Sequence, residues 1–206
     1  MRNAYCVKKL LITLRNTHYA FGLLVIPLLA LLIACQSPEP LPPTPTPEPQ
    51  PLEVFEYTDS AEFNLLYPSD WLTILPRPGI LLFGEEQTIG KSEPGALMTI
   101  LLVPTNKVHG DLQGELEHYL DFGPRRDGYM EVDEIEEREL DGKPALTVRM
   151  SQAGDGEFDP FETEITAVEL DNGSVYIFTS TAPADIWDAN QDKFFVILNS
   201  VKFVES

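Results

Sequence analysis

Acidic side chains at alternate positions come nearest to metal-binding chemistry in this chain. Asp155, Glu157 and Asp159 occupy the first, third and fifth positions of a short polar segment, which is how an EF-hand calcium loop begins. The rest of that pattern is missing, because Pro160 stands where the loop needs glycine and Thr166 stands where it needs the closing glutamate. We therefore expect a solvated acidic loop, with a weak calcium site as the alternative.

A second run of acids covers residues 131–139, of which six are Asp or Glu. Alternate residues of a strand point to opposite faces, so these acids would fall on both faces, and we interpret the run as a solvated sheet edge or a protruding strand end. The alternative is contact with a basic partner, for which the candidate residues are Glu131, Asp133, Glu134, Glu136 and Glu137.

The residues needed for common catalytic sites do not occur in a matching pattern. The chain has no G-x-S-x-G nucleophile elbow. Outside the N-terminal segment its only histidines are His109 and His118, which are nine residues apart and lack the H-E-x-x-H spacing of a zinc site. We expect two surface histidines without a role, no cofactor and no enzymatic activity.

The N-terminus has the three parts of a secretory signal. Residues 1–19 carry four Lys or Arg and no acid, and residues 20–34 are apolar. Leu32-Ile33-Ala34-Cys35 resembles the lipobox of bacterial lipoproteins, which predicts cleavage between Ala34 and Cys35 and attachment of lipid to Cys35. An uncleaved anchor is the alternative, although this run is shorter than the roughly 20 residues of a membrane span. Both interpretations place residues 36–206 outside the cytoplasm.

A proline-rich linker separates this signal from the rest of the chain. Eight of the sixteen residues at positions 36–51 are proline. Such a segment favours an extended polyproline II spacer, which would reach roughly 50 Å at about 3.1 Å per residue. We therefore divide the chain into a signal peptide at 1–34, a lipidated cysteine and linker at 35–52, and a globular domain at 53–206.

The charge of the chain excludes one class of partner. The formal net charge is −19, and removal of residues 1–34 would take away four cations and no acid, which makes it −23. Nucleic acids are bound by basic surfaces, so we expect no nucleic-acid partner. Flat binding to anionic lipid headgroups is disfavoured for the same reason.

Hydrophobic patterning predicts an α+β domain with an antiparallel sheet. Strands are expected before and after a helix that begins at Asp111, and hairpins are expected at Asp141-Gly142 and at residues 171–173. A second helix is expected at residues 185–200, and a last strand at 201–204 is expected to pair within the main sheet. Residues 84–95 are rich in helix breakers and are expected to form a loop.

Several motifs of this domain together resemble the PsbP/DcrB-like superfamily. They are Phe63, Tyr67-Pro68 and Trp71, the turn segment at residues 140–145, and the closing stretch at residues 194–203. The resemblance covers essentially all of residues 53–206 and rests on packing and turn motifs. It implies an α/β/α sandwich with a central antiparallel sheet flanked by helices, and a binding or assembly module without shared catalytic residues.

These observations predict a lipid-anchored, extracytoplasmic interaction or assembly module. Its membrane contact would be the lipid on Cys35, and its partner would be another envelope protein. A small-ligand or cation-binding lipoprotein is the alternative, with Trp187 or Trp71 as a ligand platform rather than core. The expected core residues are Phe63, Leu65, Trp71, Phe194, Ile197 and Phe203.

Overall fold

The computed structural model describes residues 50–58, 62–91, 93–154 and 159–204. The predicted signal, Ala34, Cys35 and most of the linker lie outside the described residues, as do Asp155 and Glu157. The described part of the chain is an α+β domain with a large antiparallel sheet, as the patterning predicts. Among these residues no helix is long and apolar enough to span a membrane.

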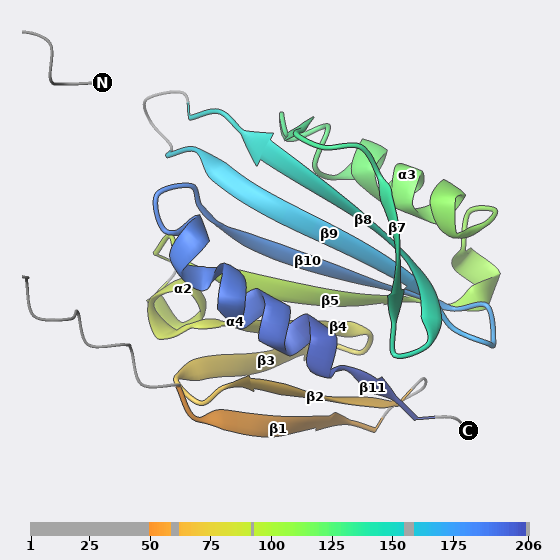
Figure 1. The fold of residues 1–206 in the computed structure, drawn as a ribbon, viewed down its shortest axis with the longest axis horizontal. Helices are drawn as coiled ribbons and strands as arrows, with labels where there is room; N and C mark the ends of the chain where they lie inside the picture. The colour runs from red at the N-terminus through yellow and green to blue at the C-terminus, as the bar shows by residue number, and fades with distance from the viewer. Residues whose placement is uncertain (1–49, 59–61, 92, 155–158, 205–206) are drawn as a thin grey trace, which may run out of the picture. The chain divides into compact units, whose positions relative to one another are not determined.

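The large sheet has eight strands in the order β3-β4-β5-β10-β9-β8-β6, and β7 also pairs with β8 (Figure 1). Its strands are β3 (Trp71–Arg77), β4 (Ile80–Glu85), β5 (Leu97–Val103), β6 (Met130–Glu131), β7 (Glu136–Leu140), β8 (Lys143–Gln152), β9 (Phe161–Glu169) and β10 (Val175–Pro183). The small sheet has the order β1-β2-β11, and consists of β1 (Leu52–Tyr57), β2 (Phe63–Pro68) and β11 (Lys202–Phe203). The helices are α2 (Glu86–Lys91), α3 (Leu112–Phe122) and α4 (Trp187–Ser200).

The two faces of the large sheet are covered by different helices, because successive side chains of a strand alternate between faces. On β10, Val175 and Ile177 belong to the core beneath α3, whereas Tyr176 and Phe178 belong to the core beneath α4. The central strands are therefore apolar on both faces, which explains the near-continuous hydrophobic runs in their sequence.

Local chemistry places the turns and the start of α3 where the sequence predicts them. The Asp111 carboxylate accepts a hydrogen bond from the Gly114 backbone N–H at 2.8 Å and so caps α3. Asp141 and Gly142 have φ values of 50° and 77°, as a two-residue hairpin turn requires at both positions.

Helix α4 connects the two sheets. Its inward side carries Trp187, Phe194, Ile197 and Leu198, which share one core with residues of β2, β4, β5 and β10. The hydroxyl of Ser200 accepts a hydrogen bond from the Leu66 backbone N–H of β2 at 2.8 Å. In Figure 1, α4 lies across the large sheet with the small sheet beside it.

The prediction that the last strand pairs within the main sheet is wrong. β11 pairs with β2 in the small sheet, with Phe203 opposite Phe63. The reason is that α4 ends against β2 and delivers the chain to that strand's free edge. Asp141 then accepts hydrogen bonds from the Lys202 ammonium at 2.7 Å and from the Phe203 N–H at 2.8 Å. Burial alone would raise the pKa of Asp141, but these two bonds outweigh it and hold the pKa below the ordinary value.

Two further segments have structure that the sequence did not predict. Residues 84–95, expected to be a loop, contain the short helix α2. The acidic run at residues 131–139, interpreted as a sheet edge or strand end, is divided between β6 and β7 with a break at residues 132–135. Of the six predicted core residues, five are buried, and Phe203 is only partly buried, against the ring of Tyr176.

Two adjacent phenylalanines of α4 test this arrangement. Phe194 is 5% exposed and packs against Trp71 and Trp187, whereas Phe195 is 64% exposed. We expect Phe194→Ala to lower the free energy of unfolding by about 3–5 kcal/mol because it leaves a cavity. Phe195→Ala should change it by less than about 0.5 kcal/mol. Urea unfolding measures both, and equal effects would show that α4 does not turn Phe194 toward the core and Phe195 toward solvent.

Candidate functional site

The acidic run at residues 131–139 lies at an outer edge of the large sheet. β8 pairs with β9 on one side and with β6 and β7 on the other, and among the described residues no further strand pairs with β6 or β7. The acids exposed along this edge are Glu131, Asp133, Glu134, Glu136, Glu137 and Glu139. This placement agrees with the interpretation of a solvated edge.

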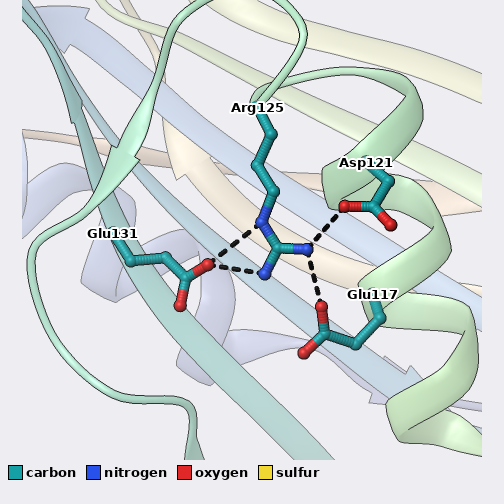
Figure 2. Close-up of polar contacts among 4 residues, drawn as sticks. All are labelled: Glu117, Asp121, Arg125 and Glu131. Carbon is teal, nitrogen blue, oxygen red and sulfur yellow. Dashed lines mark hydrogen bonds and ion pairs between the residues drawn. The ribbon is translucent and has the colours of Figure 1, made fainter.

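Glu131 differs from the other acids of this edge because it forms an ion pair with another residue of the same chain. Figure 2 shows Arg125 surrounded by Glu117, Asp121 and Glu131. Its guanidinium donates to Glu117 and Asp121 at 2.7 Å each and to Glu131 at 2.5 Å. The hydrogen bonds to Asp121 and Glu131, with that to Glu117, raise the pKa of Arg125 above its already high usual value.

This network binds the end of α3 to β6. Three carboxylates around one guanidinium leave a local excess of negative charge. Glu131 is therefore a structural ion-pair residue, and the edge acids left for a partner are those at positions 133–139. Arg125 lies in the turn after α3, beyond Gly123 and Pro124, so the helical i,i+4 rule gave no signal for its pair with Asp121. The role of Glu131 likewise depends on the fold.

Of the three acids that form the predicted solvated loop, with a weak calcium site as the alternative, only Asp159 lies among the described residues, and it is exposed. Asp155 and Glu157 lie outside the described residues. In the part of the chain that the structure describes, no three His, Cys, Asp or Glu side chains are grouped so that they could hold a metal ion. The calcium site stays an untested alternative.

The two histidines are closer together than their spacing suggests. The rings of His109 and His118 stack with their centroids 3.5 Å apart. Glu115 is buried, and its carboxylate lies 3.0 Å from Nδ1 of His109 and accepts the His109 backbone N–H at 2.7 Å. These contacts fasten the loop before α3 to the helix, which is a structural role.

Trp71 and Trp187 are core residues, as their apolar neighbours predict. Their exposed fractions are 3% and 2%, so neither indole is a free platform. Each Nε1 is buried without a hydrogen-bond partner among the described residues, which is an unfavourable state for a donor. Trp187 also lies beneath the Arg149 guanidinium, whose central carbon is 5.6 Å from the ring centroid.

A groove of about 320 Å³ runs beside α4, and we call it the α4 groove. Its lining includes Glu164 and Ser180 from the large sheet and Trp187, Phe194 and Phe195 from the helix. Glu164 and Ser180 are direct partners in the pairing of β9 with β10. An acid therefore lies next to aromatic side chains in a partly enclosed space, which is typical of ligand and partner sites.

The Glu164 carboxyl has an altered pKa in this groove. Burial raises the pKa above its ordinary value, Arg138 and Arg149 counteract the rise, and Glu136 adds to it. Glu164 makes no hydrogen bond or close ion pair with any residue that the structure describes. Sequence reasoning did not find this groove. The available signal was the alternation in β9, which places Glu164 on the same face as Thr166 and Val168.

Comparison with known proteins identifies the fold. No family model matches the chain, and no curated protein matches its sequence. Cyanobacterial PsbP (CyanoP) from Synechocystis sp. PCC 6803 has a similar structure, with a TM-score of 0.51 and 17% identity over 81% of this chain and 100% of that one. LpqN of Mycobacterium tuberculosis, described as involved in cell envelope biogenesis, has a TM-score of 0.53 and 16% identity over 75% and 92%.

A third similar structure belongs to a eukaryotic protein. The Ran-binding protein Mog1p of Saccharomyces cerevisiae has a TM-score of 0.51 and 8% identity, over 76% of this chain and 97% of that one. At these identities the comparisons show a shared fold, and they support the PsbP-like architecture that the sequence motifs imply.

The Glu164 carboxyl gives a pH-dependent prediction. Because its pKa is raised in the native state, the native protein holds a proton that the unfolded chain has lost as the pH rises above the ordinary carboxyl range. Stability therefore falls with rising pH through this window. We expect Glu164→Gln to have a higher urea midpoint than the wild type at pH 7, and a similar one at pH 4.

Glu169→Gln, on the same strand but the opposite face, is the matched control and should not show this pH-dependent gain. A lower midpoint for Glu164→Gln at pH 7 would contradict the prediction. It would mean that the carboxylate stabilises the fold through Arg138 or Arg149.

Proposed function

We propose that this protein is a lipid-anchored, extracytoplasmic module that binds another protein of the cell envelope and catalyses no reaction. The observation that carries the proposal is the acidic edge of the large sheet at β6 and β7, with which no further strand pairs in the part of the chain that the structure describes. The backbone N–H and C=O groups on the outer side of an edge strand are available to a partner strand or loop.

Charge decides which partner suits this edge. Asp133, Glu134, Glu136, Glu137 and Glu139 are exposed there, and like charges oppose pairing between two identical copies. A basic partner surface would be attracted to this acidic edge, because complementary charge speeds encounter and favours one orientation. We therefore expect a partner with Lys or Arg at its contact surface.

The predicted anchor and linker support the same function. A lipidated Cys35 would hold the domain at a membrane, and residues 36–51 would let it reach a neighbouring protein. Two of the similar folds belong to proteins described as Ran-binding and as involved in cell envelope biogenesis, which is consistent with a fold used for binding.

Cys35→Ala tests the anchor. We expect the variant to carry no lipid and to keep residues 1–34, because the cysteine is both the acylation site and the residue after the cut. Stable membrane anchoring needs two or more acyl chains, so a lipidated wild type should stay with membranes. Intact-mass measurement of membrane-extracted protein checks this. A wild-type mass that includes residues 1–34 and no lipid would contradict it.

The triple variant Asp133→Asn, Glu134→Gln and Glu137→Gln tests the edge. We expect it to fold normally and to lose several-fold in partner cross-linking yield at low salt, with a smaller loss at high salt because exposed charges are screened. Cross-linking in the native membrane followed by mass spectrometry measures the yield.

The matched control changes Glu56, Glu62 and Glu93 to Gln. These acids are also exposed and lie outside β6 and β7, and their loss alters the net charge by the same amount. If both triple variants lose cross-linking equally, net charge rather than the edge governs association. If neither variant loses it, the edge is not the contact.

A further inference from the structure

The α4 groove combines an apolar wall with an acid, Glu164, that has no hydrogen bond or close ion pair to any described residue. Glu164 and Ser180 lie on paired strands, and the helix contributes Trp187, Phe194 and Phe195. Phe195 is a large aromatic side chain that is 64% exposed, unlike the buried Phe194 and Ile197 of the same helix. The groove thus offers an apolar surface that leads to a carboxylate.

The two cationic side chains that act on Glu164, Arg138 and Arg149, make their close polar contacts with other residues. Arg149 pairs with Glu162 at 3.3 Å and lies over the Trp187 ring. Arg138 donates a hydrogen bond to the Asn199 side chain of α4 at 3.3 Å. Both act on Glu164 only through longer-range attraction, so the carboxylate oxygens keep their hydrogen-bonding capacity.

The other charges around the groove are mostly acidic. Glu136 acts on Glu164 from the edge strand β7, Glu162 precedes it by two residues on β9, and Asp192 lines the groove from α4. With Glu164 these make four acids against the two arginines. A group entering the groove therefore meets a negative local environment, and a positive charge is favoured there.

We propose that the α4 groove binds a lysine or arginine side chain of a protein partner. The alkyl stem would lie along Phe195 and the neighbouring apolar wall, as long cationic side chains do on apolar surfaces. The cationic head would donate hydrogen bonds to the Glu164 carboxylate, and charge-assisted bonds of this kind are the stronger ones. This site rests on the proposed function, since it supplies a specific pocket for a basic partner that the edge acids would attract.

Short peptides test the groove without the natural partner. The full chain in detergent micelles is titrated with acetyl-Ala-Leu-Lys-Leu-Ala-amide, with its arginine analogue, and with an analogue in which norleucine replaces lysine. Norleucine keeps the alkyl stem and removes the ammonium group. The indole N–H resonance of Trp187 reports binding, and Trp187→Phe assigns that resonance.

We expect the lysine or arginine peptide to bind, and the norleucine peptide to bind at least about tenfold more weakly, since a hydrogen bond to a charged group contributes on that scale. Glu164→Gln should weaken the cationic peptides by a similar factor and leave the norleucine peptide unchanged. Phe195→Ala should weaken all three peptides alike. Glu169→Gln, outside the groove, should weaken none.

Equal binding of lysine and norleucine peptides, an unchanged affinity in Glu164→Gln, or no shift at millimolar peptide would each overturn the groove site. These results are separate from the proposed function. If no peptide binds in the groove but the edge variant still loses partner cross-linking, the groove site is rejected and the proposed function stands. If peptides bind but no partner is cross-linked, the proposed function is rejected and the groove site stands.

Discussion

The packing of α4 against both sheets is the constraint on which the rest of this structure depends. The small sheet has three strands, which is about the minimum that can be stable, and it needs a hydrophobic face covered by another element. Phe194, Ile197 and Leu198 cover it while also packing on the large sheet. Because the helix must lie near β2, it leaves part of the same face of β9 and β10 open beside it, and this open part is the α4 groove. The site is thus a consequence of how the two sheets are joined.

Contacts near the end of the described chain fasten α4 and β11 to both sheets. The hydroxyl of Ser200 holds the last turn of α4 against Leu66 of β2, and the next residues extend the small sheet as β11. Asp141 then connects β11 to the hairpin turn between β7 and β8 through Lys202 and the Phe203 N–H. The acidic edge strand is therefore fastened at one end to the small sheet, and at the other end Glu131 is fastened to α3 through Arg125.

Sequence reasoning succeeded where the physical cause is local. The Asp111 cap, the Asp141-Gly142 turn and the apolar stripe of α4 each depend on residues within a few positions of one another. It failed for β11, whose partner β2 lies more than a hundred residues away along the chain, because pairing between distant strands depends on the packing of α4. The groove was missed for the same reason, since Glu164, Ser180 and Phe195 meet only through strand register and helix placement.

A raised carboxyl pKa in an open groove has a consequence for how such a site would work. Ionised Glu164 lowers the stability of the unbound native state, and an incoming cation would remove that penalty when it binds. The bound complex would then gain both the direct hydrogen bonds and the relief of an unfavourable, partly buried charge. Such a contact could be weak by itself and still be effective, because the proposed anchoring of both proteins in one envelope would raise their local concentration. Under the proposed function, weak and reversible binding in the groove, together with an acidic edge that would accelerate encounter, would be sufficient for a tethered binding module without a deep or rigid pocket.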